Sequence, residues 1–166
     1  VKVDASGEEV WSKNFGAEVD EEATSLIAVE DGYVMAGYVE NTSRDRDFYI
    51  VKVKEDGGLL WSRTYGSRFE YEEALDIAVN EEGELYIGGN IESTAGPIHL
   101  IKTTSEGVEI WENTYTTNFI EGPFSKLVLA EDGVLITGSV SITGDNSDFY
   151  LLKVDDRGNK IWDNHF

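Results

Sequence analysis

The chain contains no cysteine, and its 166 residues include only 2 prolines, 2 histidines and 1 methionine. Without cysteine, neither a disulfide bridge nor a thiolate metal site can form. A catalytic triad needs a histidine, so it has few places to form in this chain. No apolar run approaches the roughly 18 residues that span a bilayer, and we expect no transmembrane segment.

Basic residues are also scarce, with 13 Lys and Arg against 33 Asp and Glu, which gives a formal net charge of −20. Such a surface repels phosphate backbones and anionic lipid head groups. We therefore expect neither a nucleic-acid partner nor a membrane partner. Solubility is the simplest interpretation of the charge, and a specific cation-binding role is the alternative.

What the chain does have is a repeat marked by four tryptophans, Trp11, Trp61, Trp111 and Trp162, which are 50, 50 and 51 residues apart. Each lies in the same phrase, which reads VKVDASGEEVW, VKVKEDGGLLW, IKTTSEGVEIW and LKVDDRGNKIW. A fixed period of this length indicates one structural unit copied along the chain. The predicted units are a half unit over residues 1–16 and full units over 17–66, 67–116 and 117–166, within a single repeat domain.

Each full unit predicts four short strands and no helix. The runs are rich in Val, Ile, Leu, Tyr and Phe, and Gly, Asp or Asn bounds them, as is typical of strands joined by tight turns. Four glycines recur where a hairpin needs a residue that tolerates positive φ, namely Gly7, Gly57, Gly107 and Gly158. Gly37, Gly89 and Gly138 recur inside the second strands, where we expect a bulge or a close backbone approach.

A four-stranded sheet with bulky residues on both faces must be covered on both sides, and radial stacking does this in a β-propeller. The fold class that we predict is all-β, a β-propeller of four-stranded antiparallel blades, with about 3.5 blades in the chain. The first strand of each blade would line the axis, and the tryptophan strand would lie outermost. A two-sheet sandwich is the alternative, but it predicts no such period.

The segments DFYIVKVKEDGGLLW and DFYLLKVDDRGNKIW, the first preceded by DGYVMAGYVENT, resemble the repeats of PQQ-like (quinoprotein-type) β-propellers. The resemblance is closest to blades of uncharacterised archaeal and bacterial surface proteins, which implies an extracellular or cell-surface location. It also implies that the four tryptophans are docking residues that hold adjacent blades together. The quinone chemistry of that family does not carry over, because its calcium ligands, general base and stacking indole cannot be assigned here.

The number of blades does not close a ring, since propellers have about 4 to 8 of them. Either the chain is a slice of a longer propeller, or copies of it assemble. Uncovered blade faces and unpaired strand edges favour self-association. We expect a homo-oligomer, most simply a homodimer.

Acidic residues in the loops before the first strands are the candidate metal ligands. These are Asp20 and Glu22 in one unit and Glu70 and Glu73 in the next, with Glu121 in the third. Oxygen-rich sites of this kind suit Ca²⁺. A solvated acidic rim is the simpler interpretation, because no spacing matches a known calcium loop.

No catalytic constellation is found, and we expect no enzyme activity and no cofactor beyond a candidate Ca²⁺ site. His99 aligns with Tyr49 and Tyr150 of the neighbouring units, which favours a packing role. The leading interpretation is therefore a non-catalytic propeller scaffold or binding module. The alternatives are a fragment of a PQQ-type oxidoreductase or hydrolase with its catalytic residues elsewhere, and a designed repeat without natural activity. Calorimetric titration with Ca²⁺ and PQQ separates the enzyme fragment from the other two.

Overall fold

The protein is described here by a computed structural model. It describes residues 1–16, 19–41, 45–66, 70–91, 96–116, 120–141 and 147–166, and only the backbone of residues 120–123. The described residues contain fourteen strands and no helix, which confirms the all-β prediction. The described part of the chain thus contains no helix that could span a membrane.

The strands form one two-stranded hairpin and three four-stranded antiparallel sheets. The N-terminal hairpin comprises β1 (Lys2–Val3) and β2 (Glu9–Trp11). The first sheet comprises β3 (Asp20–Val29), β4 (Gly32–Glu40), β5 (Arg46–Lys54) and β6 (Leu59–Tyr65). The second comprises β7 (Glu72–Val79), β8 (Leu85–Ile91), β9 (Ile98–Thr103) and β10 (Glu109–Tyr115). The third comprises β11 (Ile120–Ala130), β12 (Gly133–Ser141), β13 (Ser147–Asp155) and β14 (Lys160–His165).

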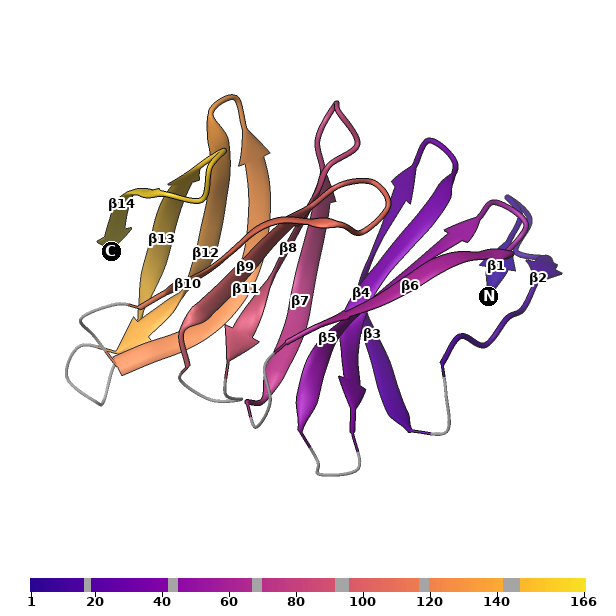
Figure 1. Ribbon diagram of the computed structural model, residues 1–166, viewed down its shortest axis with the longest axis horizontal. Helices are drawn as coiled ribbons and strands as arrows, with labels where there is room; N and C mark the ends of the chain where they lie inside the picture. The colour runs from indigo at the N-terminus through magenta and orange to yellow at the C-terminus, as the bar shows by residue number, and fades with distance from the viewer. Residues whose placement is uncertain (17–18, 42–44, 67–69, 92–95, 117–119, 142–146) are drawn as a thin grey trace.

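The three sheets stand side by side, face to face, with the N-terminal hairpin at one end and the third sheet at the other (Figure 1). Within each sheet the strands follow one another in chain order. Each sheet lies inside one of the predicted full units, whose boundaries at residues 17, 67 and 117 fall outside the described residues. The described residues do not form a closed ring, so the propeller itself stays a prediction.

Two apolar cores fill the spaces between the sheets. One lies between the first and second sheets and centres on Phe48, Ile50 and Ile87. The other lies between the second and third sheets and centres on Leu100, Ile136 and Leu152. Both faces of the second sheet are therefore covered, which explains why its middle strands β8 and β9 are buried along almost their whole length.

A bulge on the first strand of each sheet lies beside a glycine of the second strand. The pairing register shifts between Ala23 and Ser25 and again between Ala74 and Asp76, next to Gly37 and Gly89. A β-carbon on Gly37 would collide with the Glu22 carbonyl oxygen, and one on Gly89 with the Glu73 carbonyl oxygen. The predicted close backbone approach is confirmed at these two sites.

Candidate functional site

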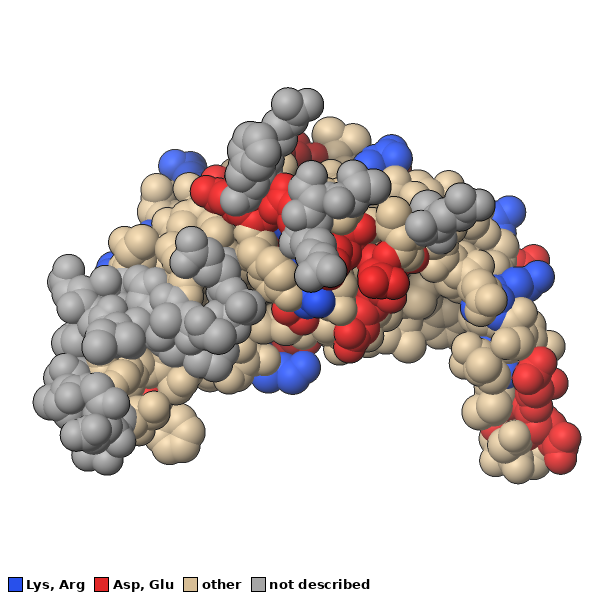
Figure 2. Space-filling view, turned by 90° about the horizontal axis from the view of Figure 1, so that it is seen from below, with Lys and Arg blue, Asp and Glu red and all other residues tan. Residues whose placement is uncertain are grey.

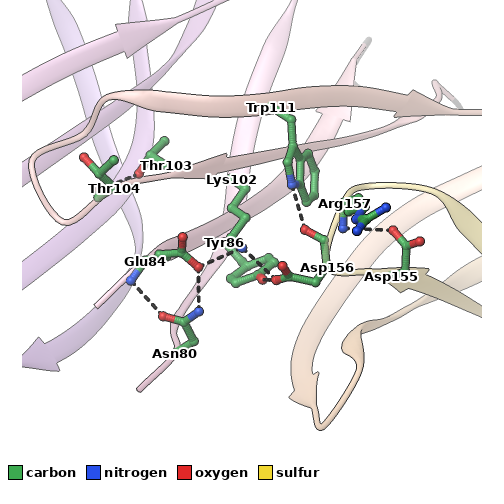
Figure 3. Close-up of polar contacts among 10 residues, drawn as sticks. All are labelled: Asn80, Glu84, Tyr86, Lys102, Thr103, Thr104, Trp111, Asp155, Asp156 and Arg157. Carbon is green, nitrogen blue, oxygen red and sulfur yellow. Dashed lines mark hydrogen bonds and ion pairs between the residues drawn. The ribbon is translucent and has the colours of Figure 1, made fainter. Parts of the chain in front are cut away.

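Each tryptophan that has a following sheet donates a hydrogen bond to it. The indole Nε1 of Trp11 donates to the Glu55 carbonyl oxygen at 2.9 Å, and that of Trp61 to the Ser105 carbonyl oxygen at 3.3 Å. Trp111 donates to the Asp156 carbonyl oxygen at 3.0 Å (Figure 3). All three acceptors lie in the tight turn that joins the third and fourth strands of the following sheet. We call each of these contacts between a tryptophan and the following turn a joint.

The glycine in each acceptor turn is required for two reasons. Gly57, Gly107 and Gly158 have φ of 80°, 73° and 83°, a region that favours glycine, as the sequence predicted. A β-carbon at each of them would also lie 3.1 Å from the indole ring of the preceding tryptophan. Because glycine has no side chain, the indole ring can lie close to the backbone of the turn.

A tyrosine completes two of the joints. Tyr65 donates its hydroxyl hydrogen bond to the Gly107 carbonyl oxygen at 2.7 Å, and Tyr115 to the Gly158 carbonyl oxygen at 2.8 Å. Burial raises the pKa of Tyr65 to about 12 and also raises the pKa of Tyr115. Both hydroxyls therefore stay protonated donors at neutral pH.

The third-strand lysines bind acids of the neighbouring hairpin turn in their own sheet. Lys52 pairs with Asp31 at 2.9 Å, Lys102 with Glu84 at 2.7 Å, and Lys153 with Asp132. These three repeated lysines therefore have a structural role, because each of them binds an acid of a hairpin turn.

Lys102 also reaches across the joint to the third sheet. Its Nζ lies 2.7 Å from Asp156 Oδ1 and 5.1 Å from the centre of the Tyr86 ring (Figure 3). Although burial opposes it, hydrogen bonding to Asp156 and Glu84 raises the pKa of Lys102. The hydrogen bonds from Lys102 and Tyr86 in turn lower the pKa of Asp156. Two sheets are thus connected by a charged pair as well as by the indole.

Acidic grooves lie between the β-hairpin turns of neighbouring sheets. The groove between the second and third sheets has a volume of about 770 Å³, and Tyr86 lies among its lining residues. Its acidic lining comprises Glu81, Glu82, Glu84, Glu131 and Asp156. The groove between the first and second sheets has a volume of about 530 Å³, with the acids Glu30, Asp31, Glu81, Glu82 and Glu106. Glu81 and Glu82 line both grooves.

At the opposite edge of the sheets, Arg46 lies in a cluster that includes two of the predicted metal ligands, Glu22 and Glu73. Its guanidinium lies 3.7 Å from the centre of the Tyr38 ring and 4.6 Å from that of Tyr71. It pairs with Glu40 at 3.2 Å and with Glu73 at 3.5 Å. The Tyr38 hydroxyl donates to Glu22 at 2.9 Å. Burial, partly offset by Arg46, raises the pKa of Glu73.

The structure thus brings Glu22 and Glu73 to one cluster, and Glu22, like Asp20 and Glu70, is exposed. Acidic side chains gather over the middle of this face in Figure 2. Among the described residues, no group of three or more His, Asp or Glu could hold a metal ion. The Glu121 side chain lies outside the described residues. The calcium site stays a prediction, and no sequence pattern points to Arg46 as the centre of the cluster.

Asp76 is a second residue that the sequence analysis missed. Its carboxylate accepts hydrogen bonds from Ser25 Oγ at 3.0 Å, from Lys126 Nζ at 3.0 Å and from the Leu127 backbone N–H at 3.0 Å. Ser25 lies on β3, and Lys126 and Leu127 lie on β11. One buried carboxylate therefore connects the first strands of all three sheets.

No protein-family model matches the chain, and no curated protein matches it. Among solved structures that do match, one is the crystal structure of the eukaryotic initiation factor, with a TM-score of 0.55 and 7% identity. The match covers 96% of this chain and 35% of that one, so the chain spans 35% of the length of this solved neighbour. At this identity the likeness shows a similar fold alone.

Proposed function

We propose that the chain is part of a β-propeller built from PQQ-like repeats and acts as a non-catalytic binding module. Its ligand surface is the pair of acidic grooves between the hairpin turns, and its partner is a protein segment rich in arginine or lysine. The observation that carries the proposal is that two grooves with acidic linings share Glu81 and Glu82. The side chains around the joints are used for packing and hydrogen bonding.

Groove size and charge both support this kind of ligand. Volumes of about 770 and 530 Å³ can take one or two long side chains. Carboxylates bind guanidinium groups in bidentate fashion, and each groove is lined by several of them. The net charge of −20 also attracts a cationic partner at long range.

The proposal is tested with a fluorescein-labelled octapeptide of alternating arginine and glycine, titrated with the protein by fluorescence anisotropy. Glu82→Lys changes a groove residue that is exposed and makes no packing contact in either core. Glu9→Lys is the matched control, because it makes the same charge change on the exposed β2 strand. We expect Glu82→Lys to weaken binding about tenfold, with a smaller effect of Glu9→Lys.

Both variants share one net charge, so the comparison separates the grooves from the overall field. An equal loss in the two variants would show that the peptide senses only the total charge, and the groove proposal would fail. Binding that does not weaken with added salt would contradict it too, since exposed charge pairs are screened.

A further inference from the structure

Lys102 holds together two acids that line the larger groove, between the second and third sheets. Its Nζ lies 2.7 Å from Glu84 Oε2, just before β8, and 2.7 Å from Asp156 Oδ1, in the turn between β13 and β14. Figure 3 shows Lys102 between the two acids. The Lys102 side chain is 4% exposed, whereas those of Glu84 and Asp156 are 29% and 64% exposed. We call these three residues the lysine bridge.

Each acid of the lysine bridge uses one of its two oxygens for contacts within the protein. Glu84 Oε2 accepts a further hydrogen bond from Asn80 Nδ2 at 2.8 Å, and Asp156 Oδ1 accepts one from the Tyr86 hydroxyl. Within the described part of the chain, the other oxygens, Glu84 Oε1 and Asp156 Oδ2, accept no hydrogen bond. One oxygen from each sheet is thus available to a ligand, on a carboxylate that is already held in place.

The smaller groove, between the first and second sheets, has a serine in place of the second acid. Lys52 pairs with a turn acid of its own sheet, Asp31, at 2.9 Å. Ser105 stands where Asp156 stands in the following sheet, since the carbonyl group of each accepts a tryptophan hydrogen bond. Across the groove, Lys52 Nζ meets the Ser105 carbonyl oxygen at 3.3 Å. The pair of acids on one lysine is therefore particular to the larger groove.

We propose that the lysine bridge is a guanidinium site, through which the larger groove selects arginine over lysine in a basic segment. One guanidinium would donate to Glu84 Oε1 from one nitrogen and to Asp156 Oδ2 from another, as a planar group with five N–H donors can do. An ammonium group is a compact point charge and gains less from two acceptors at fixed positions. The inference rests on the proposed function, because it names the side chain that the groove holds.

Lys102 is a positioning residue in this site. Two carboxylates with no cation between them repel each other, and Lys102 neutralises one of their charges while it holds both. One negative charge of the lysine bridge is left for the ligand. The exposed acids of the same groove, Glu81, Glu82 and Glu131, add to the attraction.

The first measurement compares two fluorescein-labelled octapeptides by fluorescence anisotropy, one of alternating arginine and glycine and one of alternating lysine and glycine. Both carry the same charge, so the ratio of their dissociation constants reports the preference for guanidinium. We expect the arginine peptide to bind the unchanged protein about fivefold more tightly. Equal binding of both peptides would overturn the guanidinium site and leave the proposed function standing. Binding of neither would overturn both.

The Lys102→Met variant separates positioning from charge. The substitution makes the groove more negative, so attraction by charge alone predicts tighter binding of both peptides. Positioning predicts the opposite for arginine, whose dissociation constant should rise about threefold, with the preference over lysine lost. Lys52→Met is the matched control, because it removes the same charge beside the smaller groove and should not lower the preference. Tighter binding of the arginine peptide by Lys102→Met would overturn the role of Lys102.

Two further variants test the acids without loss of a lysine. Tyr86→Phe removes the hydroxyl that donates to Asp156 and should reduce the preference for arginine. Ser105→Asp places the missing acid beside Lys52 in the smaller groove and should increase it. The preference is a ratio measured on one sample, so a partly unfolded variant lowers binding of both peptides alike and leaves the ratio unchanged. No increase in Ser105→Asp would contradict the assignment of selectivity to the paired acids.

Discussion

His99 is a histidine at a strand position where the other two sheets have a tyrosine, Tyr49 and Tyr150. Its ring is buried and lies 5.0 Å from the Phe48 ring, so the predicted packing role is confirmed. Nε2 donates a hydrogen bond to Glu112 at 2.7 Å, and in the third sheet the Tyr150 hydroxyl donates to Asp163 at 2.9 Å in the same way. Nδ1 is a buried nitrogen without a hydrogen-bond partner among the described residues. Nδ1 lies 3.7 Å from the buried Glu72 Oε1, and the contact of Nε2 with the fourth strand replaces the one that a tyrosine hydroxyl makes in the third sheet.

This environment predicts a pH-dependent stability. Burial, opposed by Glu112, lowers the pKa of His99 below the ordinary 6.5. The unfolded chain then binds a proton at a higher pH than the folded chain does. The free energy of unfolding should fall as the pH drops below 6.5 and level off below the folded-state pKa, by at most about 1.4 kcal/mol per pH unit.

Urea unfolding of the protein and of His99→Tyr across this pH window measures the effect. A tyrosine at this position does not titrate in this pH range, so the His99→Tyr variant should lack the fall in the free energy of unfolding that His99 causes. Identical slopes for the two proteins would contradict the assignment to His99.

At the scale of elements, the three sheets are connected at two levels. The joints connect the outer strands, and Asp76 connects the inner ones through Ser25, Lys126 and Leu127. Asp76 is 6% exposed, and its removal would leave the buried Leu127 backbone N–H without this acceptor. The carboxylate therefore has more influence on sheet packing than an exposed ion pair would have.

We predict that Asp76→Ala lowers the free energy of unfolding by about 3 kcal/mol, because it removes hydrogen bonds to a buried charge. Ser25→Ala removes one of the same contacts from the donor side and should cost about 1 kcal/mol or less. Chemical denaturation of both variants gives the two values. Similar costs for both would mean that the contacts of Asp76 to β11 contribute little.

The repeat explains what the sequence analysis could predict at this scale. The tryptophans, the turn glycines and the glycines beside the bulges recur in each unit, so their roles follow from the pattern. Arg46 and Asp76 do not recur, since Ser25 and Lys126 stand where Asp76 stands in the second sheet. Their contacts depend on which side chains meet across two different sheets, and no periodicity contains that information.

Over the whole molecule, the excess of negative charge is the dominant electrostatic feature. The net charge of −20 is spread over a chain in which Lys52, Lys102 and Lys153 already pair with turn acids. Like charges repel in the compact state, and salt screens this repulsion more strongly than it weakens partly buried ion pairs.

We therefore predict that the thermal midpoint rises by several degrees when sodium chloride is increased from about 10 mM to about 500 mM, a range that shortens the screening length severalfold. Differential scanning calorimetry at constant pH and protein concentration measures the shift. A falling midpoint would show instead that the ion pairs of the turns outweigh the repulsion.

The direction of the joints has a consequence for synthesis. Each indole binds a carbonyl group 44 or 45 residues further along the chain, never one behind it. Because a nascent chain emerges N-terminus first, at about 5–20 residues per second, each tryptophan waits a few seconds for its acceptor. The acceptors at residues 55, 105 and 156 are made before the next tryptophans at 61, 111 and 162. Each of the three hydrogen bonds can therefore form before the next tryptophan is translated, in the order of the chain.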